Sequence, residues 1–374
     1  MVHGEARMHD SGDQQRLDLP NRPNQVDLTI KAPGYSGNVR GLEKHERSRN
    51  LDFLRVLAAY AVVWLHVSAL VVATDPSVTN ITWWIGNIYD SFSRWCVPVF
   101  VMLSGALLIP KAANTSAASF VKTRITRIIA PLVFWTLAYI IFKYLTGANL
   151  TTLSVIKSIL AGDPYAHLWF LYMITGLYLI TPILQQIIDK TPHENVITIV
   201  ILVFFISSAE SLAGGKGKLI FSMFMPYIGY YMSGYLLFKS ETKHISFSLN
   251  VTIVVVCGAI IAVFTGILLP YIGEQAWAVM YGYLNPLVIL MSFAVFIGFL
   301  GVRPPSIFSS LAPMTLGIYL VHPMWLYVLQ RIGISGFFLN PFLGTPITAT
   351  IAFGLSAVSA MVLAQIPVFR RTVC

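Results

Sequence analysis

A cation and an imidazole stand on one face of an apolar segment near the start of the chain. Arg55 and His66 are eleven positions apart in the run RNLDFLRVLAAYAVVWLH. At about 100° per residue this spacing makes about three helical turns and separates the side chains by about 16 Å along the axis. Arg55 would fix an anionic or carbonyl group, and His66 would act as a general base near neutral pH. A snorkelling arginine and a hydrogen-bonded structural histidine explain the spacing equally well.

A second pair of cations opens a later apolar segment. Arg124 and Arg127 stand at i and i+3 in RITRIIAP, so they share one helix face. Two guanidiniums beside a helix N-terminus are suited to clamping phosphates, because the helix dipole adds a partial positive charge there. The ordinary excess of basic residues on the cytoplasmic side of a membrane protein produces the same pattern, and it is the more frequent cause.

Two small residues lie inside the second apolar segment, at the end of the run FVMLSG. Ser104 and Gly105 would let another helix backbone approach closely, so helix packing is the simpler explanation for them. The alternative is that they line a passage for a substrate.

Histidines and aromatic residues recur in two further runs, HLWFL at 167–171 and GIYLVHP at 317–323. Tyr319 and His322 are i, i+3 neighbours and would face a cavity together. His167 and Trp169 would lie at the outer end of a span. Each of these side chains is also explained by a structural role, at the membrane interface or beside the kink expected at Pro323.

The elements that position these residues are predicted to be transmembrane helices. The chain of 374 residues is 56% hydrophobic and only 11% charged, so a soluble globule would expose a large apolar surface. In hydrocarbon every backbone donor and acceptor needs a partner within the chain, and the apolar runs have helix length rather than strand alternation. We therefore predict an all-α, polytopic integral membrane helical bundle of about ten transmembrane helices. The predicted spans lie near 52–73, 86–109, 125–146, 167–188, 195–210, 219–238, 247–270, 278–300, 307–329 and 346–367.

The distribution of charge predicts the orientation. The net charge of +9 comes from basic residues that gather in the N-terminal tail and in alternate loops, which indicates membrane topology and no nucleic-acid partner. Both termini are then cytoplasmic. Residues 1–50 are polar and rich in Pro and Gly, and we expect a disordered cytoplasmic tail followed by a transmembrane domain at 51–371. Three cysteines without a CxxC run or a Cys/His cluster predict no metal site.

In combination these motifs resemble the acyltransferase-3 family of polytopic membrane acyltransferases. The resemblance covers about 49–371 and is greatest to short members, made of the membrane domain alone, that O-acetylate cell-surface glycans. Each motif is weak alone, and their order makes a chance match unlikely. The matching features are Arg55 with His66, the Phe-x-x-x-Ser-Gly run, Arg124 with Arg127 before Pro131, HLWFL and GIYLVHP.

The resemblance implies an enzyme of the cell (inner or plasma) membrane. It would move an acyl group, usually acetyl, from cytoplasmic acyl-CoA to a hydroxyl of an extracytoplasmic glycan or lipid-linked saccharide. His66 is then the catalytic histidine, as base or as nucleophile, and Arg55 is its motif partner. Arg124 and Arg127 bind the donor, acetyl-CoA, and the oligomeric state stays open. The residues expected along the substrate path are Ser104, Gly105, His167, Trp169, Tyr319 and His322.

Two other classes of protein fit part of the same evidence. A polytopic transporter or a lipid-linked glycan flippase would also hold buried charges, but the sequence has no internal repeat and no paired broken helices in corresponding halves. A scaffold that has lost its activity is disfavoured because Arg55, His66, Arg124 and Arg127 are all present. Stabilisation by CoA would separate the enzyme from both alternatives.

Overall fold

The computed structural model describes residues 35–74, 76–212, 222–240, 245–302 and 304–373, with side chains from Arg49 onward. Every regular element in these ranges is a helix, as the sequence predicts. Contacts divide the chain into two units, Met1–Glu43 and Lys44–Cys374, and the membrane-spanning segments lie in the second. The predicted tail at 1–50 lies mostly outside the described residues, although the first helix already begins at Tyr35.

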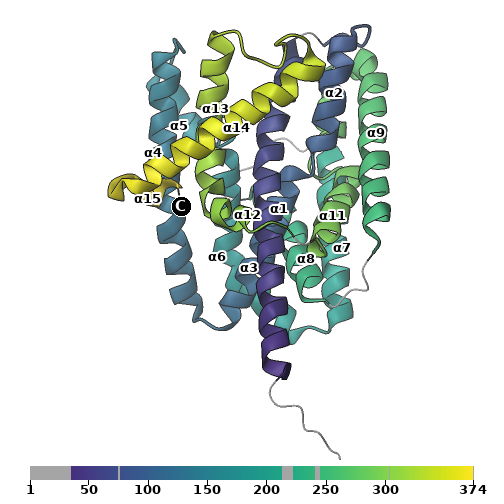
Figure 1. Ribbon diagram of the computed structural model, residues 1–374, viewed down its shortest axis with the longest axis vertical. Helices are drawn as coiled ribbons and strands as arrows, with labels where there is room; N and C mark the ends of the chain where they lie inside the picture. Colours follow the sequence, from purple (N-terminus) through teal and green to yellow (C-terminus); the bar gives the residue numbers. More distant parts are fainter. Residues whose placement is uncertain (1–34, 75, 213–221, 241–244, 303, 374) are drawn as a thin grey trace, which may run out of the picture. The chain divides into compact units, whose positions relative to one another are not determined.

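The helices follow one another with short connections (Figure 1). The first half of the chain forms α1 (Tyr35–Thr74), α2 (Ile81–Ser93), α3 (Cys96–Ala113), α4 (Ala117–Leu145), α5 (Thr152–Leu160), α6 (Trp169–Lys190) and α7 (His193–Leu212). The second half forms η1 (Met225–Tyr227), α8 (Ile228–Lys239), α9 (Phe247–Ile272), α10 (Gln275–Met280), α11 (Pro286–Leu300), α12 (Ile307–Leu311), η2 (Ala312–Met314), α13 (Thr315–Arg331), α14 (Pro341–Gln365) and α15 (Pro367–Val373).

Eight helical segments are long and apolar enough to cross a membrane among the described residues. They are Arg49–Thr74, Ile81–Ala113, Ala117–Leu145, Trp169–Lys190, His193–Leu212, Phe247–Ile272, Ile307–Arg331 and Pro341–Gln365. The other two predicted spans, at 219–238 and 278–300, coincide with the shorter helices α8 and α11, and the first of them begins outside the described ranges. A polytopic helical bundle is therefore confirmed, and the count of ten stays a prediction.

Several predicted spans are broken helices. The span predicted at 86–109 is α2 followed by α3, with the break at Arg94 and Trp95. The span predicted at 278–300 is α10 followed by α11, where Asn285 caps the second helix by accepting from the Leu287 N–H. Pro286 occupies the first turn of α11, where its missing N–H costs no hydrogen bond. These breaks let loops enter the bundle at membrane depth, where they are shielded from lipid by protein.

Glycine allows the closest helix contact in the bundle, between α3 and α8. A Cβ atom at Gly105 would lie 1.8 Å from the Tyr231 carbonyl oxygen, and one at Gly234 would lie 2.0 Å from the Met102 carbonyl oxygen. The two backbones therefore touch at both glycines, which is the packing that small residues permit in membrane helices. This contact fixes α3 at the centre of the bundle.

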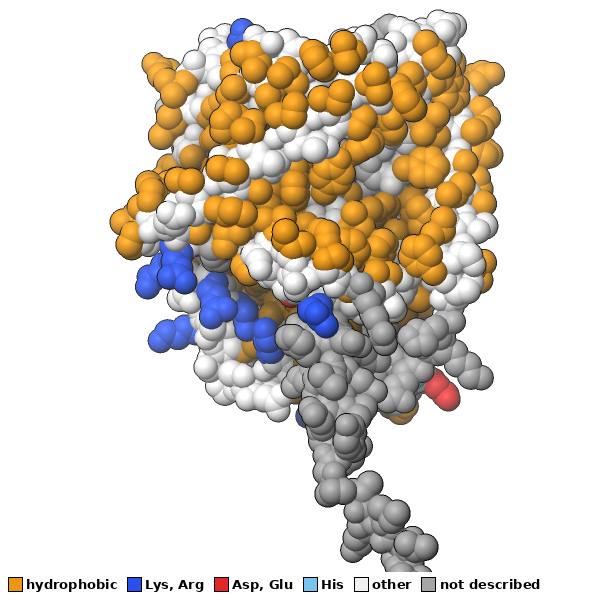
Figure 2. All heavy atoms as spheres, viewed as in Figure 1, with side chains coloured by type: hydrophobic (Ala, Val, Ile, Leu, Met, Phe, Trp, Pro, Cys, Tyr) orange, Lys and Arg blue, Asp and Glu red, His pale blue; other side chains and the backbone are white. Residues whose placement is uncertain are grey.

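The outer surface matches a lipid environment. On α4 a row of large apolar side chains at intervals of four residues is about half exposed, comprising Ile129, Val133, Leu137 and Ile141. Figure 2 shows a broad apolar surface in the upper part of the view and a group of Lys and Arg side chains beneath it. Exposed basic side chains near that end of α4 and on α15 are Lys122, Arg127, Arg370 and Arg371. The chain is therefore built with a lipid-facing band and a basic border.

The last two helices hold the C-terminal segment against α4. Helix α14 crosses the bundle obliquely and leads into the short helix α15 (Figure 1). The indole N–H of Trp135 donates to the Thr372 carbonyl at 2.9 Å, and the rings of Phe134 and Phe369 are 5.4 Å apart. These contacts fix the end of the chain on α4, near the arginines that the sequence singles out.

Candidate active site

Three arginines line one cavity of about 270 Å³, here called the arginine cavity. Arg55 comes from α1, and Arg124 and Arg127 come from α4. Arg124 is half-buried with its guanidinium 5.4 Å from the ring of Phe120, whereas Arg127 is exposed at the rim. No carboxylate lies within ion-pair distance of these three guanidiniums in the part of the chain with described side chains. The cavity is therefore strongly positive and suited to an anionic group.

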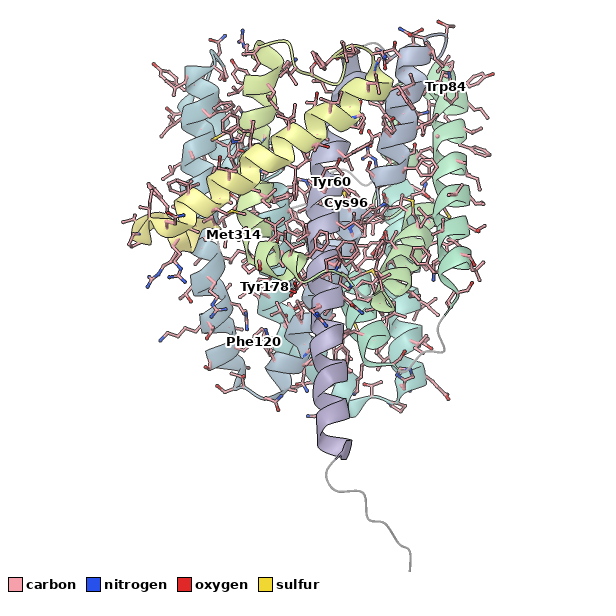
Figure 3. All side chains as sticks on the ribbon, in the orientation of Figure 1. Tyr60, Trp84, Cys96, Phe120, Tyr178 and Met314 are labelled. Atoms are coloured by element: carbon pink, nitrogen blue, oxygen red, sulfur yellow. The ribbon has the colours of Figure 1, made fainter. Side chains whose placement is uncertain are left out.

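The inner end of the arginine cavity is aromatic. The side chains of Phe170 and Tyr178 from α6 and of Tyr319 from α13 line it, together with Ser104 from α3. Figure 3 shows Phe120 and Tyr178 in the lower half of the bundle in that view, below Tyr60 and Cys96. A ligand that enters among the arginines would therefore pass from cationic to aromatic surroundings.

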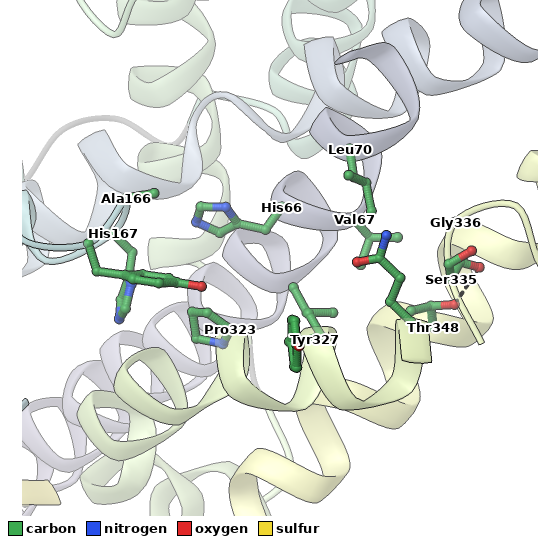
Figure 4. Close-up of a pocket in the computed structure, with 13 residues that line it drawn as sticks. His66, Val67, Leu70, Ala166, His167, Pro323, Tyr327, Ser335, Gly336 and Thr348 are labelled. Carbon is green, nitrogen blue, oxygen red and sulfur yellow. Dashed lines mark hydrogen bonds between the residues drawn. The ribbon is translucent and has the colours of Figure 1, made fainter. Parts of the chain in front are cut away.

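A second cavity of about 240 Å³, here called the histidine cavity, lies around His66 (Figure 4). His66 and Val67 come from α1, and His167 comes from the segment that leads into α6. In Figure 4 the His66 ring points toward the side of the cavity that carries Ala166 and His167. The remaining walls combine apolar side chains such as Leu70 and Leu326 with hydrogen-bonding groups, namely Tyr165, Tyr327, Gln330, Ser335 and Thr348. These groups can contact both faces and edges of a small polar ligand.

Three histidines from distant parts of the sequence meet beside this cavity. The ring centroids of His66 and His322 are 5.1 Å apart, and those of His167 and His322 are 5.5 Å apart. His322 on α13 and His167 are 0% and 1% exposed, whereas His66 is half-buried and open to the cavity. His66 is therefore the imidazole of this cluster that a ligand can best reach.

Tyr319 forms the wall between the two cavities. Its side chain lines the arginine cavity, and its hydroxyl donates to the main-chain carbonyl of His167. Its ring lies 5.4 Å from that of Phe170, and its own carbonyl accepts from Nδ1 of His322 at 2.7 Å. The wall thus includes Tyr319, which faces the arginine cavity, and His167, which faces the histidine cavity.

A family model for an acyltransferase domain, acyltransferase-3, matches residues 48–365. The chain belongs to the acyltransferase-3 family. The resemblance inferred from the sequence is thereby confirmed, and the protein is a multi-pass membrane acyltransferase that uses an acyl donor and an acceptor. No curated protein and no solved structure gives a significant match.

In this acyltransferase most of the predicted site residues line one of the two cavities, whereas Gly105, Trp169 and His322 line neither. Arg55, Arg124 and Arg127 share the arginine cavity, although Arg55 and His66 belong to different cavities. The single face that the spacing predicts on α1 is therefore divided by the wall at Tyr319. Helical spacing shows on which side of a helix a side chain lies, but it does not show which other helices pack against that side. The sequence therefore could not reveal this division.

The remaining predicted path residues differ in position. Ser104 lines the arginine cavity while its hydroxyl donates to the Phe100 carbonyl at 2.9 Å. Gly105 lies instead at the contact with α8, the helix-packing role that the sequence favours for it. The Trp169 ring stacks on Tyr283 with centroids 5.9 Å apart. The path roles of these side chains stay predictions.

A buried ion pair was not anticipated from the sequence. Asp90 in α2 is 1% exposed and pairs with Arg94, whose guanidinium lies 4.1 Å from the ring of Tyr281. The sequence feature that could have predicted this ion pair is the presence of opposite charges four positions apart in an apolar segment. Such a pair inside a span marks either a structural lock or a functional site.

The histidine cluster is not arranged as a metal site. No group of three or more His, Cys, Asp or Glu side chains that could hold a metal ion occurs among the described residues. The Nδ1–H of His322 donates to the Tyr319 carbonyl, which leaves a lone pair on Nε2 of that ring. Imidazoles arranged in this way are suited to proton transfer or nucleophilic attack.

Proposed function

We propose that this acyltransferase moves an acetyl group from cytoplasmic acetyl-CoA to a hydroxyl of an extracytoplasmic glycan or lipid-linked saccharide. The observation that carries the proposal is the pair of cavities, one cationic and one lined by histidine, with Tyr319 and His167 in contact between them. Such an arrangement suits a reaction whose two substrates arrive from opposite sides of a membrane.

The arginine cavity would receive the donor. CoA carries phosphates that match the guanidinium fork, and its thin pantetheine arm would extend along the aromatic inner end of the cavity. Arg124 and Arg127 would bind phosphate, and Arg55 would bind the donor closer to the wall. Since basic side chains favour the cytoplasmic side, this cavity would open to the cytoplasm and both termini would lie there, with the chain in the cell membrane.

The histidine cavity would receive the acceptor. Its volume of about 240 Å³ has room for one sugar residue. The rings of Tyr165 and Tyr327 would contact its apolar face, and Gln330 and Thr348 would hydrogen-bond its hydroxyls. A sugar at the end of a lipid-linked or growing chain meets these requirements.

His66 would carry the proton. It accepts the proton of the acceptor hydroxyl while the hydroxyl oxygen attacks the thioester carbonyl carbon. A C–O bond forms, the C–S bond breaks, and the proton passes from His66 to the leaving thiolate. A transient acyl-histidine would need the same free lone pair on His66, so both routes depend on this side chain. In either route the Tyr319 side chain has to make room for the acyl group.

The test compares thermal stability of the detergent-purified protein with and without acetyl-CoA. We expect stabilisation of the wild type and of His66→Ala, and loss of stabilisation in the Arg124→Ala, Arg127→Ala double variant. Transfer of labelled acetyl to a lipid-linked saccharide should fall by at least about 100-fold in His66→Ala. His193→Ala, at the start of α7, is the matched histidine control.

A folded wild type that acetyl-CoA does not stabilise would contradict the donor assignment. In that case the acyltransferase takes its acyl group from a donor other than acetyl-CoA. Stabilisation by CoA together with normal transfer in His66→Ala would instead exclude His66 as the base.

A further inference from the structure

The buried His322 ring lies behind His66 as seen from the histidine cavity. His322 is 0% exposed, and it is not among the residues that line either cavity. Its ring centroid is 5.1 Å from that of His66, which does line the histidine cavity. His322 can therefore influence a ligand in this cavity only through the two imidazoles that line it, His66 and His167, or through movement of the wall.

The hydrogen bond to Tyr319 determines which nitrogen of His322 carries the proton. A carbonyl oxygen only accepts, so the contact of 2.7 Å between His322 Nδ1 and the Tyr319 oxygen requires an Nδ1–H group. The carbonyl of Tyr319 is available because the residue four positions later is Pro323, which has no backbone N–H to donate. In the neutral ring, Nε2 therefore carries a lone pair.

This lone pair has no hydrogen-bond partner within the described part of the chain, and the Nε2 atom is buried. A buried acceptor without a donor is unfavourable, so a nearby N–H group that can turn toward it gains free energy. Two imidazoles surround it, His66 on α1 and His167 in the segment before α6. The Tyr319 hydroxyl is committed to the His167 carbonyl.

We propose that His322 is a positioning residue that fixes the tautomer of His66. His322 Nε2 accepts the N–H of one His66 nitrogen, and the other His66 nitrogen then presents its lone pair to the histidine cavity. His66 is preferred to His167 as the donor because its centroid is nearer and its ring borders the cavity. The inference rests on the proposed function, in which that lone pair takes the acceptor proton.

The arrangement has a clear chemical consequence. A base whose second nitrogen is held by a neighbouring acceptor spends all its time in the reactive tautomer, and the same acceptor stabilises the imidazolium that forms on proton transfer. Without that acceptor, the neutral ring divides between two tautomers and the reactive nitrogen is protonated in part of the molecules. The rate constant kcat should then fall with little change in the KM of either substrate.

The first measurement is the tautomer of His66 by ¹⁵N NMR of the histidine-labelled full chain in detergent, with the His66 signal assigned by its loss in His66→Gln. We expect a single tautomer in the wild type, a mixture in His322→Phe, and a single tautomer again in His322→Gln. The glutamine amide can accept from His66 and still donate to the Tyr319 carbonyl, so it preserves both hydrogen bonds. His322→Phe keeps a ring of similar shape.

The second measurement is acetyl transfer by the same variants. We expect kcat to fall about 10- to 100-fold in His322→Phe and to be largely restored in His322→Gln. A His66 ring that keeps a single tautomer in His322→Phe overturns the proposal, and so does full activity alongside a tautomer mixture. If His322→Phe does not fold, the wild-type spectrum alone still tests the proposal. A proton on Nε2 of His322 in the wild type would overturn the proposal, and so would a mixture of His66 tautomers.

The two proposals can fail separately. A tautomer shift in His322→Phe with no acetyl transfer by the wild type leaves the pairing of the imidazoles intact and removes the proposed function. If acetyl transfer requires His66 but is unchanged by substitution of His322, the proposed function stands and the positioning role of His322 is removed.

Discussion

The hydroxyl of Tyr319 on α13 donates to the main-chain carbonyl of His167, and this hydrogen bond joins α13 to the segment that leads into α6, at the wall between the cavities. Its partners are 152 positions apart in the sequence. The contact places an aromatic side chain of the arginine cavity directly against the histidine cluster. It therefore determines both the stability of the wall and what can pass through it.

Tyr319→Phe should weaken this wall. It leaves the His167 carbonyl buried without its donor, which costs about 1–3 kcal/mol and should lower the apparent unfolding temperature by several degrees. We also expect faster hydrolysis of acetyl-CoA in the absence of acceptor, because water can cross a loosened wall. Tyr60→Phe is the control, since its hydroxyl bonds Thr350 at the exposed surface. Unchanged stability and hydrolysis would show that the bond does not close the wall.

Arg124→Ala and Arg127→Ala should weaken donor binding. Each guanidinium that contacts a phosphate contributes about 1.5–3 kcal/mol, so the KM for acetyl-CoA should rise by about 10- to 100-fold per residue while kcat changes little. The matched control is Lys122→Ala, which removes the same charge from an exposed position of α4. Equal effects of all three substitutions would indicate a general electrostatic attraction, and no effect would leave the arginines with a topological role only.

Gly105→Ala and Gly234→Ala should disrupt the contact between α3 and α8. Each new Cβ atom would lie 1.8–2.0 Å from a backbone carbonyl oxygen, which cannot move without shifting a helix. Overpacking of this kind costs about 1–3 kcal/mol or more, and thermal unfolding in detergent should show a clear loss of stability. Gly354→Ala on α14 has nothing within 4 Å and should be neutral or slightly stabilising. Similar stabilities for the three variants would argue against this close contact.

Asp90→Asn should be strongly destabilising. It leaves the Arg94 guanidinium in the bundle without its carboxylate, and breaking a buried pair in this way costs about 3–5 kcal/mol. The double variant Asp90→Asn, Arg94→Gln should recover much of the loss because no charge then stays unpaired. Recovery of stability without recovery of acetyl transfer would show that the Arg94 charge also serves the reaction. If Asp90→Asn is as stable as the wild type, the ion pair does not stabilise the fold.

The sequence alone determined the local features of this protein. Apolar runs of helix length specify an all-helical membrane bundle, because hydrocarbon leaves the backbone no other partners. Helical periodicity places Arg124 beside Arg127 and puts Arg55 and His66 on one side of α1. The ordered motifs, Arg55 with His66, HLWFL and GIYLVHP among them, indicated the acyltransferase-3 family, which the family match confirms. Each of these inferences uses residues close together in the chain or motifs in a fixed order.

Only the tertiary structure decided which of these residues meet. Lipid solvates every apolar helix equally well, so hydrophobicity does not decide which helices pack together. Close packing decides it, as at the paired glycines of α3 and α8, together with a few polar contacts between distant segments. That packing separates Arg55 from His66 by the wall at Tyr319 and brings His322 to His66 across 256 positions of sequence. Such contacts depend on the arrangement of whole helices, and no local pattern in the sequence encodes them.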